Sequence, residues 1–428
     1  MAMDDERQVN EQETTGPERE PLSVPSGESK SPGVGRKPGE KAQGNSPRET
    51  GKKGLLPPIR HLPRLLILLA VVLVVVVLTT MEDGNHFVTL RRWLMYGDSG
   101  TGENEYAYVA DNNNRFAMLG DGLLVANQNT IQLLDDDGTI RYTTSVSMSA
   151  PMISASGDMA AICDIGGTSI YLVDESGVRR TMKTSNGLRY YSARLNSSGW
   201  LAVTEEKNGY KASVSVYNSS GELVFSFDSY DNYISDALVT EDCQSVVAVG
   251  LGAQDGTFGS TLLVYDLSEA ALTASCQIQD GLPMDIACGR NDRILALCDT
   301  RLAMADQEGN LLLDYPYGSL YLHNYALGGD NFSALLLGKY QAGNICELTT
   351  FDQEGQEIAS LEINEEVLDM SAAGGYLAVL YSDSLVIYNR DLEEHAQLVG
   401  TDYAGHVIME SDGTALVIAG TAAWRFLP

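Results

Sequence analysis

The chain has 428 residues, of which 44% are hydrophobic and 20% are charged, a composition typical of a folded globular protein. Its net charge of −30 lies almost entirely beyond residue 64. Residues 1–64 contain 11 Lys and Arg and 10 Asp and Glu, which leaves 17 and 48 for the rest of the chain, a net charge of −31. Because binding to nucleic acid requires clustered Lys and Arg, this acidity excludes DNA and RNA as partners of the larger part.

Residues 1–53 are rich in Glu, Ser, Pro, Gly, Lys and Gln and poor in aromatic and β-branched residues. A segment of this composition buries too little apolar surface to offset the entropy that it would lose on ordering. We therefore predict that residues 1–64 form a disordered tail.

Every residue from 65 to 78 is apolar, and residues 79–81 extend the run without a charge. As a helix, this run would rise about 26 Å, close to the lower limit for crossing the hydrocarbon core of a bilayer. A cleaved signal peptide is the alternative. It fits less well because 64 residues precede the run and Thr79-Thr80-Met81-Glu82 lacks a small-residue cleavage pattern. We expect an uncleaved transmembrane signal anchor at 65–81.

Charges flank this predicted span unequally. Glu82 and Asp83 follow it directly, and the basic residues before it are Lys52, Lys53, Arg60 and Arg64. By the positive-inside rule, we expect the tail in the cytoplasm and the acidic part outside the cell membrane, on a single-pass protein.

Beyond residue 81, short apolar or alternating runs are separated by Gly, Asn, Asp and Ser, the pattern of strands and hairpins. One hairpin motif recurs: two apolar residues, sometimes Tyr, then Asp or Asn, a few polar residues and usually Gly. Its Asp or Asn positions are Asp135, Asp174, Asn218, Asp266, Asp306, Asp352 and Asn389. The intervals between them are 39, 44, 48, 40, 46 and 37 residues.

Four short strands in every 40–45 residues is the period of a β-propeller blade. We therefore predict an all-β domain over residues 86–428, a β-propeller of four-stranded blades, with eight blades favoured and seven as the alternative. Seven full units begin near Arg115, Met152, Ser192, Ser235, Asp285, Asn324 and Leu368.

The last unit, residues 406–427, has room for only three strands. We predict that its outer strand comes from the N-terminal side, where residues 86–95 (HFVTLRRWLM) have the pattern of a strand. Closing the ring with strands from both ends would remove exposed sheet edges.

With these repeats, the chain resembles the WD40-like and quinoprotein-like β-propellers. More closely, it resembles an uncharacterised bacterial family of single-pass membrane proteins with an external propeller. The resemblance covers residues 86–428 and rests on the hairpin motif, as in Val264-Tyr265-Asp266. No Trp-Asp dipeptide ends a blade, and the repeated Trp motif of quinone-dependent dehydrogenases is missing. The resemblance therefore implies a propeller fold and does not carry over an activity.

Three patterns suggest chemistry but are better explained as turns. Gly97-Asp98-Ser99-Gly100 matches the tetrad around the nucleophile of chymotrypsin-like proteases, but the next residue is Thr101 and no His lies in a matching context. Asp135-Asp136-Asp137-Gly138 and Asp111-Asn112-Asn113-Asn114 suggest calcium, but neither continues into an EF-hand loop. We predict no catalytic, cofactor-binding or metal-binding residue, no cofactor, and a protein that is not an enzyme.

All six cysteines lie beyond the predicted span, at Cys163, Cys243, Cys276, Cys288, Cys298 and Cys346. None forms a C-x-x-C pair, and none has the spacing of a zinc site. Cysteines in apolar strand-like runs behave as small buried hydrophobes. One disulfide between Cys288 and Cys298, across a hairpin, is the alternative.

Aromatic residues, all but one of them tyrosine, recur in the predicted connections between blades and in the longer turns between second and third strands, which gather on one face of a propeller. The residues concerned are Tyr190, Tyr191, Tyr230, Tyr233, Tyr317, Tyr321, Tyr403, Tyr210, Phe258 and Tyr340. Tyrosine offers a rigid apolar plane with a polar tip, which suits a contact surface for a protein or a glycan. Packing between blades is the alternative role of these rings.

A tethered propeller without a catalytic motif favours an external protein-interaction or scaffold module, with another envelope protein as partner. A receptor for a cell-wall glycan or other ligand is the second hypothesis. A hydrolase or quinone-dependent enzyme is the third.

Overall fold

The computed structural model describes residues 100–428 except 112, 255 and 290–292. The predicted tail, the predicted span and the strand expected at 86–95 lie outside the described residues. No helix among residues 100–428, the gaps aside, has the length and apolarity that crossing a membrane requires.

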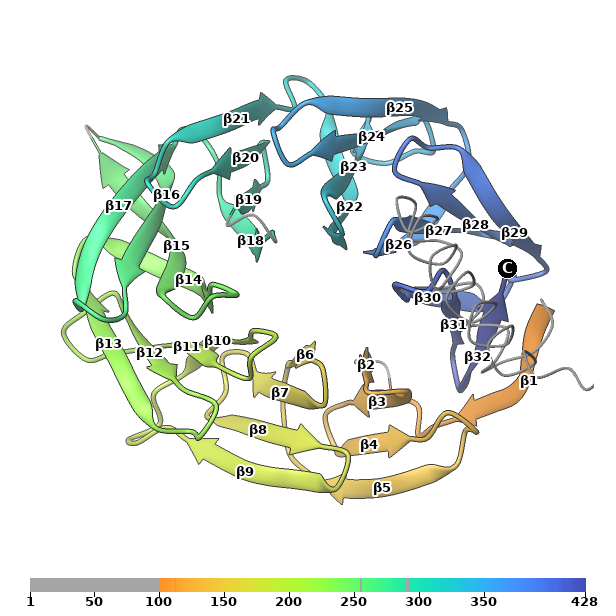
Figure 1. The fold of residues 1–428 in the computed structure, drawn as a ribbon, viewed down its shortest axis with the longest axis horizontal. Helices are drawn as coiled ribbons and strands as arrows, with labels where there is room; N and C mark the ends of the chain where they lie inside the picture. Colours follow the sequence, from red (N-terminus) through yellow and green to blue (C-terminus); the bar gives the residue numbers. More distant parts are fainter. Residues whose placement is uncertain (1–99, 112, 255, 290–292) are drawn as a thin grey trace, which may run out of the picture. The chain divides into compact units, whose positions relative to one another are not determined.

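The described residues form eight four-stranded antiparallel sheets arranged as the blades of a ring (Figure 1). In seven sheets the four strands follow one another in chain order, from the centre of the ring to its periphery. We number the blades in chain order, so that blade 1 contains β2–β5 and blade 8 contains β30–β32 with β1. The prediction of an all-β propeller with eight blades is confirmed.

The strands fall into four sets by their position in the blade. The inner strands are β2 (Arg115–Leu119), β6 (Pro151–Ser156), β10 (Tyr190–Leu195), β14 (Asn232–Val239), β18 (Pro283–Cys288), β22 (Tyr321–Gly329), β26 (Val367–Ala373) and β30 (Ala404–Met409). The second strands are β3 (Gly122–Ala126), β7 (Met159–Asp164), β11 (Leu201–Glu205), β15 (Ser245–Gln254), β19 (Ile294–Cys298), β23 (Phe332–Gly338), β27 (Tyr376–Tyr381) and β31 (Ala415–Ala419).

The third strands are β4 (Thr130–Leu134), β8 (Ser169–Asp174), β12 (Ala212–Tyr217), β16 (Thr257–Asp266), β20 (Arg301–Ala305), β24 (Cys346–Asp352), β28 (Ser384–Asn389) and β32 (Ala422–Leu427). The outer strands are β5 (Ile140–Ser145), β9 (Gly177–Lys183), β13 (Leu223–Ser229), β17 (Ala271–Ile278), β21 (Leu311–Pro316), β25 (Glu357–Ile363), β29 (Glu394–Val399) and β1 (Gly100–Ala107). The inner strands of blades 1–7 begin within three residues of the predicted unit starts.

Blade 8 is closed by strands from both ends of the described chain, in the order β1-β32-β31-β30. The closing strand is β1, in which Gly100 pairs with Leu427 and Ala107 with Ala422, and not residues 86–95 as predicted. Its sequence, GTGENEYA, is mostly polar because an outer strand needs few inward-facing apolar side chains. Tyr106 supplies one, at 1% exposure.

The core lies between neighbouring blades. The second and third strands are covered on both faces, so they are near-continuous apolar runs, as in β3 (GLLVA) and β19 (ILALC), both buried throughout. Outer strands alternate instead, as in β29. At the junction of blades 8 and 1, Tyr106 and Leu123 pack with Leu416 in one buried cluster.

Hairpin geometry explains the 135–138 pattern that suggested calcium, and it separates the two cysteines of the alternative disulfide. Residues 135–139 form the β4–β5 turn, in which the Gly138 N–H donates to the Asp135 carbonyl and the Thr139 hydroxyl donates to Asp137. Residues 111–114 include an undescribed position. In the β18–β19 hairpin, Cys288 pairs with Ile294 and Cys298 pairs with Pro283, so the two thiols lie at opposite ends. No disulfide joins any of the six cysteines, and the alternative of a disulfide between Cys288 and Cys298 was wrong.

Candidate functional site

All ten predicted contact residues lie on one face of the ring. Because neighbouring strands in a blade are antiparallel, the turn between second and third strands shares an edge with the connections between blades. Tyr190, Tyr191, Tyr233 and Tyr321 lie at the beginning of inner strands, Phe258 near the beginning of a third strand, and the other five in connections or turns. We call the surface formed by these ten residues the aromatic face.

Six of the ten side chains are exposed, by 48% for Tyr321 up to 88% for Tyr403. Tyr230, Tyr233, Phe258 and Tyr340 have exposures between these two values. Among described residues, these six are all of the exposed aromatic side chains. The ring therefore shows its exposed aromatic groups on a single face.

The remaining four residues have packing roles to different degrees. Tyr190 and Tyr317 are buried between blades, and burial raises the pKa of each hydroxyl. The Tyr317 hydroxyl donates to the Cys298 carbonyl at 3.2 Å. Tyr191 and Tyr210 are half-buried. Tyr190 and Tyr317 therefore pack between blades, which was the alternative role given for these rings.

An aromatic cluster joins blades 3 and 4 on this face. The rings of Tyr210 and Tyr230 lie 4.3 Å apart between centroids. Lys211 places its ammonium 4.9 Å from the centre of the Tyr233 ring and donates to the Asp231 carbonyl at 2.7 Å. A cation over an aromatic face holds both groups in place at the surface.

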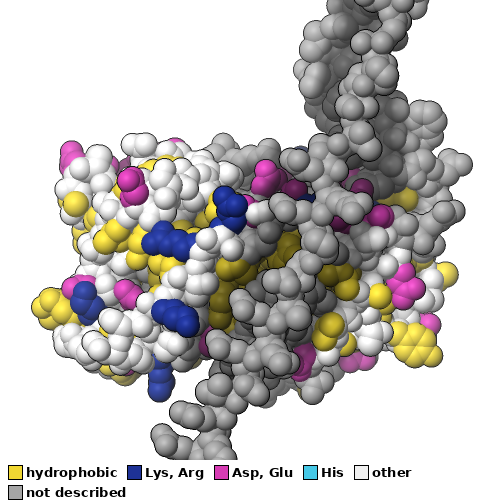
Figure 2. All heavy atoms as spheres, turned by 90° about the horizontal axis from the view of Figure 1, so that it is seen from below, with side chains coloured by type: hydrophobic (Ala, Val, Ile, Leu, Met, Phe, Trp, Pro, Cys, Tyr) yellow, Lys and Arg dark blue, Asp and Glu magenta, His cyan; other side chains and the backbone are white. Residues whose placement is uncertain are grey.

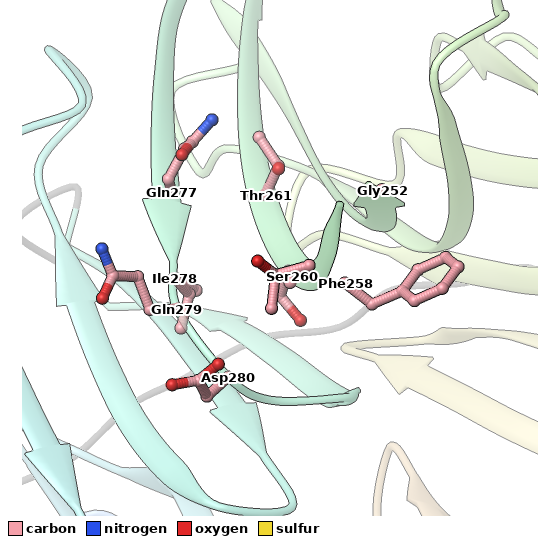
Figure 3. Close-up of a pocket in the computed structure, with 10 residues that line it drawn as sticks. Gly252, Phe258, Ser260, Thr261, Gln277, Ile278, Gln279 and Asp280 are labelled. Carbon is pink, nitrogen blue, oxygen red and sulfur yellow. The ribbon is translucent and has the colours of Figure 1, made fainter. Parts of the chain in front are cut away.

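Among the described residues, three pockets lined by the connections and turns of the aromatic face can be distinguished. One, of about 280 Å³, includes Phe258 and is drawn in Figure 3. A second, of about 550 Å³, lies between blades 5 and 6 and includes Met284 and Tyr321. A third, of about 290 Å³, includes Tyr403 and His406 beside blade 8.

Sequence reasoning missed the exposed aliphatic residues that extend this face. They are Val109, Met152, Leu282, Met284, Ile345, Leu368 and Val399. The structure gives a reason for the exposure of two of them, because a β-bulge recurs near the beginning of the inner strands in blades 3–8. A bulge adds a residue and re-aims side chains, and Met284 and Leu368 are two such inserted residues.

An Asp or Asn follows the bulge in four successive blades, at Asp236, Asp285, Asn324 and Asp369. Each side-chain oxygen accepts a hydrogen bond from the next N–H of its own strand. The other oxygen of each carboxylate reaches a neighbouring blade; that of Asp369 accepts from the Val407 N–H at 3.1 Å. The three carboxylates therefore link inner strands to one another.

Arg194 in blade 3 ties three inner strands together. Its guanidinium donates to Asp236 at 2.6 and 2.9 Å and also to Asp285 in blade 5. Burial lowers the pKa of Arg194, but the two carboxylates outweigh this effect and raise it overall. Tyr325 in blade 6 donates to Asp285 at 3.2 Å. We call these four residues the inner-strand network.

The opposite face of the ring is acidic. It carries the turns between first and second strands and between third and fourth strands. Acidic residues in these turns include Asp121, Asp158, Glu241, Asp242, Asp330, Asp412, Asp136, Glu175, Glu222, Glu269, Glu308, Glu354 and Glu393. Among the described turn residues, the basic ones are Arg293 and Arg390. We call this surface the acidic face.

Basic residues gather elsewhere. Half of the described Lys and Arg belong to residues 179–211, in blades 2 and 3. The edge view of the ring in Figure 2 shows Lys and Arg side chains together on part of the rim, among hydrophobic ones. Arg179 on β9 pairs with Asp174 at 3.2 Å. Charge is therefore unevenly distributed over this acidic ring.

Within the described ranges, no three His, Cys, Asp or Glu side chains are grouped so that they could hold a metal ion. The nearest arrangement to a nucleophile with a base is the contact between the Cys346 sulfur and Nδ1 of His323, at 3.5 Å. Nε2 of His323 lies 2.8 Å from the Tyr340 carbonyl. Burial raises the pKa of Cys346, which disfavours the thiolate.

Comparison with known proteins gives one family and a fold. The model of a family described as "Family of unknown function (DUF5711)" matches residues 99–417. No curated protein matches the chain.

The C-terminal WD40 domain of Sif2 is similar in structure, with a TM-score of 0.54 at 13% sequence identity, over 77% of this chain and 100% of that one. The β-propeller domain of Cps50 (Swd1) from Myceliophteria thermophila gives a TM-score of 0.45 at 12% identity, over 76% and 99%. At such identities, the likeness to the Sif2 domain shows the WD40-like propeller fold alone.

Proposed function

Because the chain belongs to the DUF5711 family of unknown function, we propose its role from its own surface: it is a membrane-anchored, extracytoplasmic module that binds another envelope protein through the aromatic face. A propeller is a rigid ring that presents loops from many blades on one face, and such folds commonly act as interaction scaffolds.

One observation carries this proposal: the six exposed aromatic side chains of the described residues all lie on one face. Aromatic residues are enriched at the centres of protein interfaces, where they bury large area at small entropic cost. The exposed aliphatic residues Met284 and Leu368 extend the same surface. A face of this kind fits an apolar, protein-like partner.

The anchor and its orientation rest on the sequence. The apolar run at 65–81 has the length of a span, and the basic residues before it favour a cytoplasmic tail. The resemblance to bacterial single-pass proteins with an external propeller supports the same arrangement.

We propose further that the module binds and does not catalyse. The Cys346–His323 contact is the one arrangement resembling a nucleophile with its base that we find among the described residues. A catalytic cysteine needs a lowered pKa, whereas burial raises the pKa of Cys346. This pair is better suited to packing.

The test uses the full-length protein in its native membranes. Tyr230→Ser, Tyr233→Ser and Tyr403→Ser are combined, and the crosslinked proteins captured with wild type and variant are compared. We expect the variant to lose one or more partners. Leu223→Ser is the control, since Leu223 is 56% exposed on the outer strand β13, away from the aromatic face. Capture of the same partners by the triple variant would show that this face is not the binding surface.

A further inference from the structure

The hairpin formed by β15 and β16 in blade 4 is longer than its counterparts. Each of its strands has ten residues, whereas the second and third strands of the other blades have five to seven. The neighbouring strand β17 ends early, since its last pair joins Ile278 to Ser260. A recess is left on the aromatic face where β16 continues and β17 does not.

This recess is the pocket of about 280 Å³ (Figure 3). Gly252 and Gly259 pair with each other across β15 and β16, so this part of its lining has no side chains. Thr261 pairs with Gln277 across β16 and β17, and Gln279 and Asp280 follow in the connection to blade 5. Polar side chains thus surround a surface of bare backbone.

Three polar side chains around the pocket form no hydrogen bond with another described residue. Thr261 is 7% exposed, and its hydroxyl has no hydrogen-bond partner among the described residues. The same holds for the exposed side-chain amides of Gln277 and Gln279. By contrast, the Ser260 hydroxyl is engaged, since it donates to the Gly281 carbonyl at 2.6 Å. A hydroxyl that lines a pocket and makes no bond within the protein can donate to and accept from what enters it.

The backbone at the rim is strained. Asp280 has a φ of 53°, in the left-handed region that residues other than glycine seldom adopt. This conformation takes the chain out of the sheet at the end of β17. Such outliers gather at functional sites, where the surrounding structure maintains them.

The chemistry of these groups defines a class of ligand. Each amide both donates and accepts, the hydroxyl does the same, and the Asp280 carboxylate accepts. None of the residues lining this pocket is Lys, Arg or His, so nothing in the lining favours an anion. The Phe258 ring lies on the side away from Gln277 and Gln279 (Figure 3). We propose that this pocket binds a neutral, hydroxyl-rich sugar residue of a glycan.

A peptide strand is the competing occupant, because an extended peptide can pair with an open strand edge. The open edge of β16 is short, spanning residues 257–259. Main-chain pairing there would not depend on the Thr261 hydroxyl or on the amides. The sugar is favoured because it would use all of the uncommitted groups.

The test titrates the full-length protein with two neutral oligosaccharides, the tetramer of N-acetylglucosamine and the tetramer of glucose, by calorimetry. We expect saturable binding of at least one. Thr261→Val and Gln279→Ala should each weaken it by about tenfold, the effect of losing one hydrogen bond of about 1.4 kcal/mol. Gln279 is exposed, so its substitution leaves folding intact.

Gln341→Ala is the matched control, since it removes an amide from the pocket between blades 5 and 6 on the same face. It should leave sugar binding unchanged. Absence of saturable binding to both oligosaccharides would overturn the proposal. So would binding that is unaffected by Thr261→Val and Gln279→Ala, the behaviour expected of main-chain pairing.

Discussion

At the scale of single residues, Arg194 connects the inner strands of three blades. It lies 42 and 91 residues from its two carboxylate partners, Asp236 and Asp285, and joins blades 3, 4 and 5. Its side chain is 25% exposed, and those of the two acids are 10% and 21% exposed. Removing one member of such a network leaves charges in a poorly solvated site.

We therefore expect Arg194→Met to lower the free energy of unfolding by about 3–5 kcal/mol. Arg179→Met is the control: Arg179 pairs with Asp174 but is 63% exposed, and exposed pairs contribute about 0–1 kcal/mol. Urea unfolding of both variants measures the difference. Equal, small losses would show that Arg194 does not hold the blades together.

Glu410, paired with Arg425 at 3.0 Å in blade 8, gives a prediction for pH. Burial raises the pKa of Glu410 from 4.5 to about 6, against the opposing effect of Arg425. Between these pH values the folded state binds more protons than the unfolded state, so stability falls as pH rises. The shift corresponds to roughly 2 kcal/mol, lost between pH 4.5 and pH 6.

The measurement compares unfolding free energies of wild type and Glu410→Gln between pH 4.5 and 6.5. The amide does not titrate, so the difference between the two proteins isolates the contribution of this carboxyl group. We expect wild type to lose stability relative to the variant as pH rises. A difference that stays constant across this range would contradict the raised pKa.

At the scale of elements, β1 is the strand that the fold needs for closure. Tyr106 on β1 is 1% exposed and packs with Leu123 of blade 1 and Leu416 of blade 8. Tyr106→Ala should cost about 3–5 kcal/mol, as for other large aromatic residues in a core. Glu105→Ala, at the exposed neighbouring position of the same strand, should cost less than about 0.5 kcal/mol.

Thermal and urea unfolding of both variants decide this point. Comparable stability of Tyr106→Ala and wild type would show that the Tyr106 ring does not hold β1 in blade 8.

The strands differ in how well they could be predicted from the sequence. Hairpins with Gly, Asn and Asp recur at a regular interval, so the unit starts were predicted to within three residues. The closing strand was not predicted correctly. GTGENEYA pairs through its backbone and has few apolar side chains, whereas residues 86–95 have more apolar side chains and so match the strand pattern better. A strand defined by its partner has only a weak signal of its own.

Side-chain direction was the harder prediction. Tyr190 and Tyr191 are adjacent, yet one is buried and the other half-buried, because strand residues alternate and a bulge follows Tyr190. The position of all ten residues on one face followed from topology, but their exposure did not. The inner-strand network had no sequence signal, since its members are far apart in the chain.

At the scale of the whole molecule, the two faces of the ring differ in character. The aromatic face carries the exposed aromatic side chains and three pockets, and the acidic face carries Asp and Glu in most of its turns. The chain enters β1 at the acidic face, because Gly100 pairs with Leu427 at the end of β32. Gly100 and the aromatic face therefore lie on opposite sides of the ring.

The most direct test of the central claim is photocrosslinking in intact cells from single sites in the full-length protein. A photoreactive phenylalanine analogue replaces Tyr233, Tyr403 or, as a control away from the face, Leu223. We predict that the two sites on the aromatic face crosslink to the same envelope protein and that the site on β13 does not. Crosslinks from Leu223 alone, or none from either tyrosine position, would contradict the assignment of this face as the binding surface.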